Sequence, residues 1–381
     1  MRSKGKTIGL YIHVPFCKSK CYYCDFNSFA GKDELVEPYF KALTDEIRLY
    51  AGRLKDCRIK TVFIGGGTPS CVEGRYIYET LNSCWQYFNV EQDAEVSIEA
   101  NPGTLTHEKL ILYKAAGINR LSMGLQAWQD RLLKGVGRIH NVGDFIENYD
   151  LARKAGFDNI NADLIFGLPG QTMRDWEESV INVSKIGVNH VSCYSLKVEE
   201  GTVFGDRLAS GDLTPVDEDL DREMYHFAVD KLSEKGFNHY EISNFAKPGF
   251  KCRHNLIYWE AEEYVGIGAG AHSYFEGKRF NNKYGIEEYI SSILSREFPA
   301  ENIQTISREE SMSEFMILGL RLVDGISMNE FKARFEKDVF DVFGKQISKL
   351  IKKGLIRLDG DRLKLTKIGL DLANMAFVEF V

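Results

Sequence analysis

Three cysteines stand close together near the start of the chain, directly after a short apolar run. Their spacing, CxxxCxxC, lets one loop bring three thiolates to a single metal centre. A [4Fe-4S] cluster contains four irons, so three thiolates would leave one iron open to a further ligand. Zinc is an alternative that would need a fourth ligand such as His13 or Asp25, and a trio of inert or redox-active thiols is another. The preferred interpretation is an iron-sulfur cluster bound by Cys17, Cys21 and Cys24.

Other polar or glycine-rich segments also stand where predicted strands end. The carboxyl ends of parallel strands meet on one face of an α/β fold, and active sites are built on that face. We therefore expect a converging site that includes Cys17, the glycine run at 65–67, Glu99, Gln126 and Lys197.

Between residue 8 and about residue 196, short β-rich runs alternate with helical patterns, which is typical of repeated βα units and a parallel sheet. Glycines at 117, 156 and 187 stand where helices would end in left-handed caps. Periodicity alone does not distinguish an open doubly wound sheet from a partial barrel. The predicted strands are residues 9–14, 61–64, 95–99, 120–124, 161–165 and 191–196, and helical candidates include 40–50, 108–116 and 145–155.

The pattern changes in the last part of the chain. Residues 201–300 are mixed and rich in aromatic side chains, as an elaboration of the barrel would be. Amphipathic helices are predicted at 309–320, 328–335 and 342–352, followed by a hairpin at 355–365 with Asp359 and Gly360 at its turn. We therefore divide the chain into residues 1–300, a barrel with its elaboration, and residues 301–381, a winged-helix-like α+β domain.

The composition argues against several classes of protein. The 381 residues are 44% apolar and 27% charged, which suits a globular protein with a sizeable core. A formal charge of -7 and the lack of a basic block make nucleic acid an unexpected partner, even for a winged helix. No apolar run is long enough for a membrane span and no signal peptide is recognisable, so we expect a cytoplasmic protein. The eight cysteines are then poor candidates for disulfides.

The motifs of the chain, taken in order, resemble the radical S-adenosylmethionine superfamily in its oxygen-independent coproporphyrinogen oxidase branch. The resemblance runs through the CxxxCxxC loop with its flanks at 11–16 and 25–28, GGGTP at 65–69, SIEANP at 97–102, LSMGLQ at 121–126, GRIH at 137–140 and DLIFGLPGQT at 163–172. It implies a partial (β/α)6 TIM-like barrel. It also implies that S-adenosylmethionine binds the open iron through its amino and carboxylate groups, and that an electron from the cluster cleaves its carbon–sulfur bond to give a 5'-deoxyadenosyl radical.

The resemblance assigns further residues to the cofactor. Glycines 66 and 67 let backbone atoms approach the methionine moiety, Glu99 accepts hydrogen bonds from ribose hydroxyls or the ammonium group, and Arg138 pairs with a carboxylate. Taken singly, each of the four polar residues would suit a surface charge or a helix cap better than a ligand contact, and Tyr11 and Tyr23 would equally suit the core. The predicted cofactor contacts are Tyr11, Tyr23, Gly66, Gly67, Thr68, Glu99, Gln126, Arg138 and Asp163.

Two features depart from the oxidases. Those enzymes carry a further cysteine two residues after the third cluster cysteine, where this chain has Phe26. The segment 254–259 matches HNxxYW, the motif of the HemW-type branch, which is understood as heme chaperones. The resemblance therefore implies a protein that binds heme and delivers it to acceptor hemoproteins. The alternative is an oxygen-independent coproporphyrinogen III oxidase, so enzymatic activity is left open although oxidase activity is not expected.

The heme contact is predicted at His254, because histidine is a reasonable ligand for heme iron and aromatic side chains at 258 and 259 could stack on a porphyrin. A structural hydrogen-bonding corner is the alternative role for this histidine. Weaker candidates are His140, His272 and Cys252. The expected partners are heme, acceptor hemoproteins, which can be membrane-associated, and a reduced flavodoxin- or ferredoxin-like electron donor.

Overall fold

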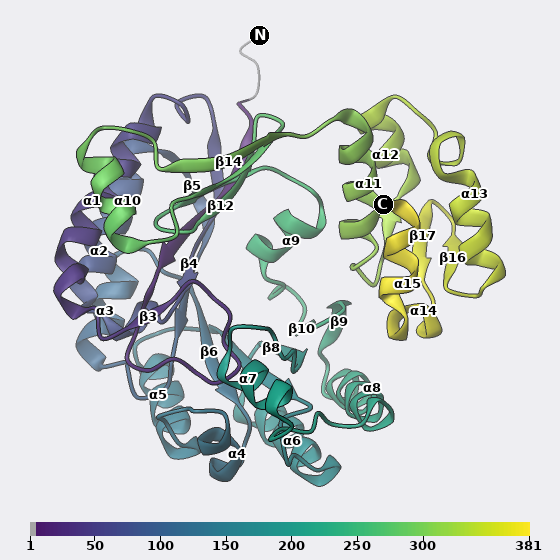
Figure 1. The fold of residues 1–381 in the computed structure, drawn as a ribbon, viewed down its shortest axis with the longest axis horizontal. Coiled ribbons are helices and arrows are strands. Elements are labelled where there is room, and N and C mark those ends of the chain that lie inside the picture. The colour runs from purple at the N-terminus through teal and green to yellow at the C-terminus, as the bar shows by residue number, and fades with distance from the viewer. Residues whose placement is uncertain (1–4) are drawn as a thin grey trace.

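Six parallel strands form the centre of the computed structural model, which describes residues 5–381 (Figure 1). They lie side by side in the order of the chain, each hydrogen-bonded to the next. Every strand predicted from the sequence is present, so the partial TIM-like barrel of six βα units is confirmed. The strands are β1 (Thr7–Val14), β4 (Arg58–Gly66), β5 (Asn89–Ala100), β6 (Arg120–Gln126), β7 (Asn159–Phe166) and β8 (His190–Ser195).

Helices cover the outer side of this sheet (Figure 1). Their apolar faces pack on the strands: in the first long helix Tyr39, Leu43, Ile47 and Tyr50 are buried at the three- and four-residue spacing of one helix face. The predicted glycine caps are present, with positive φ angles of 92°, 84° and 102° at Gly117, Gly156 and Gly187. The helices are α1 (Val36–Ala51), α2 (Gly74–Tyr87), α3 (His107–Ala115), α4 (Asp130–Gly135), α5 (Val142–Lys154) and α6 (Met173–Ile186).

The segment between residues 201 and 305 extends the sheet at both edges. Beside β8 it adds two antiparallel strands, and beside β1 it adds one parallel strand followed by three antiparallel ones, which gives a 12-stranded sheet. The last strand, β14, begins at the predicted domain boundary and pairs with the barrel sheet. The added elements are α7 (Val203–Ser210), α8 (Glu218–Glu234), β9 (Asn238–Glu241), β10 (Asn244–Ala246), α9 (Arg253–Trp259), β11 (Tyr264–Ile267), β12 (His272–Phe275), β13 (Lys278–Asn282), α10 (Ile286–Leu294) and β14 (Ala300–Thr305).

The C-terminal residues form a smaller unit with its own hydrophobic core, at the right of Figure 1. Three helices and a hairpin are present as predicted, and a short strand joins the hairpin to make a three-stranded sheet, which is the winged-helix-like arrangement. Two short helices then return toward the barrel. The elements are α11 (Arg308–Gly319), β15 (Ile326–Ser327), α12 (Met328–Phe335), α13 (Val339–Lys352), β16 (Ile356–Asp359), β17 (Arg362–Leu365), α14 (Lys367–Asp371) and α15 (Ala373–Phe377).

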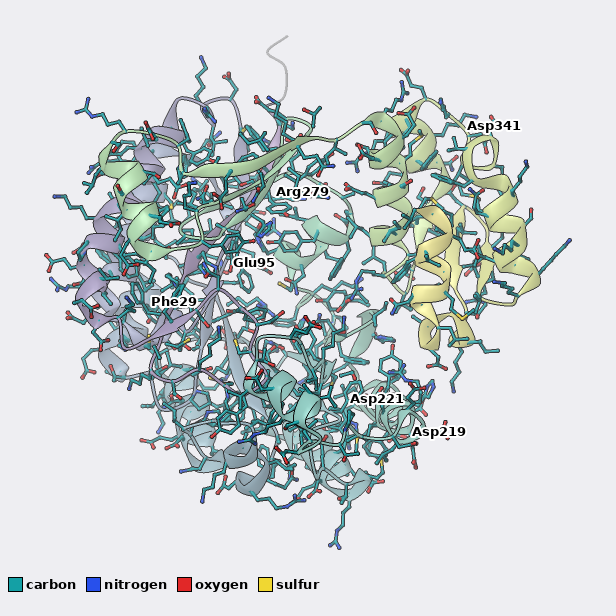
Figure 2. The ribbon with its side chains drawn as sticks, viewed as in Figure 1. Phe29, Glu95, Asp219, Asp221, Arg279 and Asp341 are labelled. Atoms are coloured by element: carbon teal, nitrogen blue, oxygen red, sulfur yellow. The ribbon has the colours of Figure 1, made fainter. Side chains whose placement is uncertain are left out.

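Polar contacts join the two units. Arg279 of β13, labelled in Figure 2, forms an ion pair with Glu314 of α11 at 2.6 Å. On the other side of the interface, His226 of α8 contacts Asp371 of α14, with 3.0 Å between nitrogen and oxygen. Within the described part of the chain, no helix combines the length and apolar character that crossing a bilayer requires.

A buried carboxylate connects α1 with the added strands. Glu46 has no exposed surface. One of its oxygens accepts hydrogen bonds from the Gly268 N–H at 2.8 Å and the Tyr289 hydroxyl at 2.6 Å, and the other accepts from the Asn282 amide at 2.7 Å. Burial raises the pKa of Glu46 to about 7, and these three hydrogen bonds oppose that rise. The carboxylate therefore holds together elements that are more than 200 residues apart in sequence.

We predict that Glu46→Gln destabilises the protein by about 2–4 kcal/mol, because both Glu46 oxygens face donors and a glutamine would turn its own NH2 group toward one of them. The measurement is the free energy of unfolding from urea denaturation at pH 7.5. Exposed Glu34 provides the control, since Glu34→Gln should change stability by less than about 0.5 kcal/mol. An equal effect of the two substitutions would contradict this account of Glu46.

Candidate functional site

The three cysteines lie in a loop that two short strands close at its base. β2 (Phe16–Cys17) pairs with β3 (Phe29–Ala30), so the loop leaves the end of β1 and returns beside it. His13 of β1 bonds to the carbonyl oxygen of Asn27 at 2.8 Å, and the Asn27 amide donates to the carbonyls of Ala269 and Tyr284 at 3.1 and 3.0 Å. The loop is thus fastened both to its own strand and to residues much later in the chain. Cys17, Cys21 and Cys24 are free and half-buried.

The glycine run at the end of β4 packs against this loop through close backbone contacts. The Gly67 N–H donates to the Val14 carbonyl at 2.8 Å, and the Thr68 N–H donates to the Phe16 carbonyl at 2.8 Å. A Cβ atom at Gly67 would lie 2.6 Å from the Phe16 oxygen and 3.0 Å from Cys17 Sγ. Gly67 therefore has to be glycine because of close approach, whereas Gly66 also has a φ of +112°.

A guanidinium group stands beside the cysteine loop. Arg138 donates to the Gly124 carbonyl at 2.7 Å, to the Asn101 side chain at 3.0 Å and to Gln126, and its other Nη lies 3.4 Å from Cys21 Sγ. Gln126 has a φ of +67°, an uncommon conformation for a residue other than glycine. The end of β6 thus fixes the predicted carboxylate-binding arginine next to the cysteines.

Two acids lie on central strands on either side of β6: Glu99 near the end of β5 and Asp163 on β7. Glu99 accepts a hydrogen bond from the Gly66 N–H at 3.2 Å, and burial, followed by the negative charge of Asp163, raises the pKa of Glu99 to about 8. Asp163 accepts from the Asn161 amide at 2.8 Å and the Ser122 hydroxyl at 3.2 Å, and burial raises its pKa as well. A cationic or hydroxyl-bearing ligand would relieve the cost of keeping both carboxylates charged.

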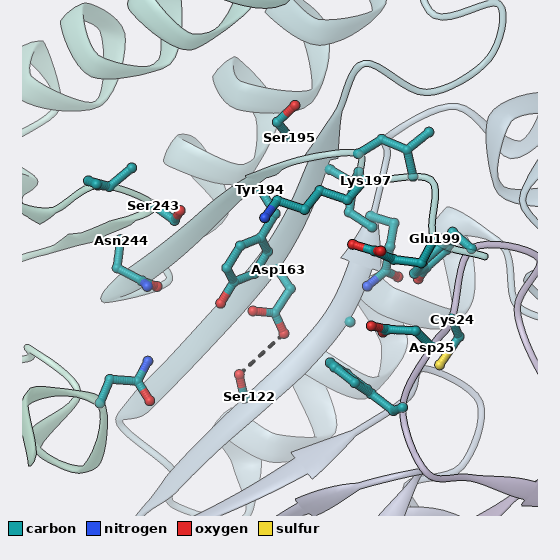
Figure 3. A pocket seen from close by; sticks show the side chains of 18 of the residues that line it. Cys24, Asp25, Ser122, Asp163, Tyr194, Ser195, Lys197, Glu199, Ser243 and Asn244 are labelled. Carbon is teal, nitrogen blue, oxygen red and sulfur yellow. Dashed lines mark hydrogen bonds between the residues drawn. The ribbon is translucent and has the colours of Figure 1, made fainter. Parts of the chain in front are cut away.

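These groups share one cavity of about 880 Å³, which is within the range of ligand pockets. In Figure 3, Cys24 and Asp25 lie on one side of it, Ser243 and Asn244 lie on the opposite side, and Asp163 and Tyr194 lie between. The far wall includes Asn255, Tyr258 and Trp259 of α9 and residues of α14 and α15. The predicted residues that line the cavity are Cys17, Cys21, Tyr23, Cys24, Gly66, Gly67, Thr68, Glu99, Gln126, Arg138, Asp163 and Lys197.

Two of the predicted contacts do not line this cavity. Tyr11 belongs to β1, and its hydroxyl lies 3.0 Å from His13 Nδ1. His254 is 1% exposed and both ring nitrogens are engaged, Nδ1 with the Thr61 hydroxyl and Nε2 with the Tyr258 hydroxyl, each at 2.8 Å. Burial, followed by the positive charges of Arg120 and Lys60, lowers the pKa of His254 to about 3. In this conformation His254 has a structural, hydrogen-bonding role. Binding iron would require one of its two hydrogen bonds to break.

The sequence analysis missed the groups that hold α9 in place. The Glu95 carboxylate of β5, labelled in Figure 2, accepts hydrogen bonds from the backbone N–H groups of Arg253 and His254 at 2.9 and 3.0 Å. Arg120 is buried nearby; burial lowers its pKa, but its acidic neighbours, among them Glu95 and Asp163, raise it on balance. In the sequence, only the alternation of polar and apolar residues along β5 indicated that Glu95 faces inward. His140, His272 and Cys252 do not line the cavity.

Comparison with known proteins agrees with this geometry. A family model described as the radical SAM superfamily matches residues 11–181, and one described as the HemN C-terminal domain matches residues 306–372. A protein of Bacillus subtilis (strain 168) named Heme chaperone HemW is 38% identical over 372 residues, covering 97% of this chain and 98% of that protein. The chain belongs to the HemW family. The relative of the same name in Escherichia coli (strain K12) is 32% identical over 371 residues and is covered to 95%.

The solved structure of coproporphyrinogen III oxidase (HemN) from Escherichia coli, described as a radical SAM enzyme, shares the fold of this HemW family member. The TM-score is 0.86 at 22% sequence identity, and the match covers 100% of this chain and 91% of that one. The similarity therefore extends over both the barrel and the C-terminal unit. At this level of identity it shows the fold alone.

We predict that Gly67→Ala lowers the stability of the cofactor-free protein by about 1–3 kcal/mol, because the added methyl group meets backbone that cannot move without displacing the cysteine loop. The matched control is Gly135→Ala at the end of α4, where nothing lies within 4 Å of the added atom. That substitution should be neutral or stabilise by about 0.5–1 kcal/mol. Urea denaturation measures both, and destabilisation by the Gly135 variant alone would contradict the prediction.

Proposed function

We propose that this protein binds heme and delivers it to acceptor hemoproteins, and that it carries a [4Fe-4S] cluster on Cys17, Cys21 and Cys24 with S-adenosylmethionine at the open iron. The observation that carries the proposal is the continuous cavity. It has three free cysteines on one side and, on the other, the aromatic residues of the HNxxYW segment together with apolar residues of the C-terminal unit. The name of the curated relatives, heme chaperone, supports the same function.

The residues present fit the cluster and its ligand. Three thiols without disulfide partners line one cavity together with Arg138, whose guanidinium lies 3.4 Å from Cys21 Sγ. Arg138 can hold a carboxylate, and Glu99 and Asp163 can accept hydrogen bonds from ammonium or hydroxyl groups. When bound, the cluster supplies the electron for reductive cleavage of S-adenosylmethionine. The reductant in this proposal is a flavodoxin- or ferredoxin-like protein.

Phe26 favours heme handling over the oxidase reaction. It occupies the position where the oxidases of this branch carry another cysteine, its side chain is 60% exposed, and it lines the cavity. An exposed phenylalanine there offers an apolar contact for a tetrapyrrole but no thiol for chemistry. We also place the protein in the cytoplasm, with acceptors that include membrane-associated hemoproteins.

We predict about four irons and four sulfides per chain after anaerobic purification. Cys17→Ala, Cys21→Ala and Cys24→Ala should each lose most of both, because a cluster held by two thiolates is labile. Cys71→Ala is the matched control, since Cys71 is also half-buried and lies close to the loop, with its Sγ 3.4 Å from the Phe16 carbonyl. Stoichiometric zinc without sulfide in the wild type would overturn the cluster assignment.

We predict that hemin titrated into the cluster-loaded wild type produces a saturable Soret shift, and that reductant, S-adenosylmethionine and coproporphyrinogen III yield no protoporphyrinogen. A parallel titration of cluster-free protein shows whether the two cofactors are coupled. Phe26→Cys should gain no oxidase activity, because a thiol alone does not supply the rest of an oxidase site. Conversion of coproporphyrinogen by the wild type without hemin binding would replace the heme proposal with the oxidase alternative.

A further inference from the structure

An arginine from the C-terminal unit forms part of the far wall of the cavity. Arg321 lies just beyond the end of α11, and its backbone carbonyl accepts a hydrogen bond from the Ile242 N–H at 3.2 Å, which ties it to the turn between β9 and β10. Its guanidinium carbon lies 4.3 Å from the centroid of the Trp259 ring. Both side chains line the cavity. A planar cation stacked on an indole is held in a fixed orientation.

The polar atoms of this pair lack partners. Among residues 5–381, no carboxylate lies within 4.0 Å of the Arg321 guanidinium in an ion pair, and no side-chain hydrogen bond from Arg321 is formed. Its Nε and the Trp259 Nε1 are both buried without an acceptor. Arg138 also has a buried Nε without an acceptor, but one of its Nη groups has three oxygen acceptors, and Arg222 pairs with Asp221 and Asp371. Buried donors without acceptors are costly, so a ligand acceptor at this place would be strongly stabilised.

The surroundings indicate the class of ligand. Glu241 feels the charge of Arg321: burial raises the pKa of Glu241, and the hydrogen bond from Asn244 and the positive charge of Arg321 oppose that rise. One Glu241 oxygen accepts from Asn244 and from the Ser243 N–H, and the other is buried without a donor in the described chain but forms no ion pair with Arg321. Apolar side chains of the same cavity, Leu372 and Met375, are 44% and 46% exposed. A carboxylate attached to a flat apolar body would satisfy the arginine and cover these side chains at the same time.

We propose that Arg321, stacked on Trp259, is a carboxylate subsite that holds a propionate group of a tetrapyrrole whose apolar face lies against the C-terminal segment containing Leu372 and Met375. This inference rests on the proposed heme-binding function and adds the anchoring group and the orientation of the ligand. It assigns recognition of heme to the junction of the two units rather than to iron ligation by His254. The forked geometry of the guanidinium suits a carboxylate better than the point charge of a lysine does.

The test compares hemin with hemin dimethyl ester, which has the same ring and iron but no free carboxylate. Soret titrations of the full-length, cluster-loaded protein give the Kd of each probe for wild type, Arg321→Gln, Arg321→Lys and the control Arg357→Gln, an exposed arginine of β16. We expect the wild type to bind hemin at least tenfold more tightly than the ester. Arg321→Gln should weaken hemin about tenfold to a hundredfold and leave the ester unchanged, Arg321→Lys should fall between, and the control should match the wild type.

Several outcomes would overturn the subsite. The subsite is refuted if Arg321→Gln binds hemin with the affinity of the wild type. It is also refuted if the variant loses affinity for hemin and for the ester equally, since that indicates a structural role for the arginine. If the glutamine variant fails to fold by circular dichroism, equal affinities of the wild type for hemin and its ester would still refute the subsite. A wild type that binds no hemin at all refutes the proposed function itself, whereas hemin binding with an unaffected Arg321 variant refutes only this inference.

Discussion

The arrangement of the site depends on one close approach between two backbones. The turn after β4 donates hydrogen bonds to the carbonyls of Val14 and Phe16, and this contact is possible only because position 67 has no side chain. It places the cysteine loop over the carboxyl ends of the parallel strands. Glu99, Gln126 and Asp163 then reach the same cavity simply because their strands run parallel to β1 and end at the same edge. A single steric constraint therefore aligns the thiols with polar groups from three other strands.

A second set of contacts, all buried, holds the opposite wall. Glu95 fixes the start of α9 through two backbone N–H groups, and His254 fixes its body through hydrogen bonds to Thr61 and Tyr258. The order of residues in HNxxYW thus has a structural role: its histidine orients the helix, and the aromatic residues that follow line the cavity. In the proposed function, His254 holds the helix in place, whereas Tyr258 and Trp259 are the residues of the motif that contact the ligand.

The sequence was sufficient for features that depend on local pattern. Alternation and glycine caps located the six central strands and their helices, and the spacing of Cys17, Cys21 and Cys24 located the loop. The parallel pairing of β11 with β1 could not be predicted, because the sequence of a four-residue strand does not indicate which strand about 250 residues away it pairs with. The same limit applies to Arg321, which follows the end of α11 and belongs to no motif of the sequence. Its significance comes only from Trp259, a neighbour in space, and from the lack of an ion pair between Arg321 and any carboxylate in the described chain.

The anchoring of the cysteine loop has a consequence for the order in which the protein matures. Asn27 is held by the carbonyls of Ala269 and Tyr284, and β1 acquires its second neighbour only with residues 264–267. A ribosome adding about 5–20 residues per second therefore releases the loop many seconds before its anchors exist. Throughout that interval the three thiols belong to a nascent chain whose outer strand edge is open. The loop therefore takes its final geometry only late in synthesis, after the segment containing Ala269 and Tyr284 has been made.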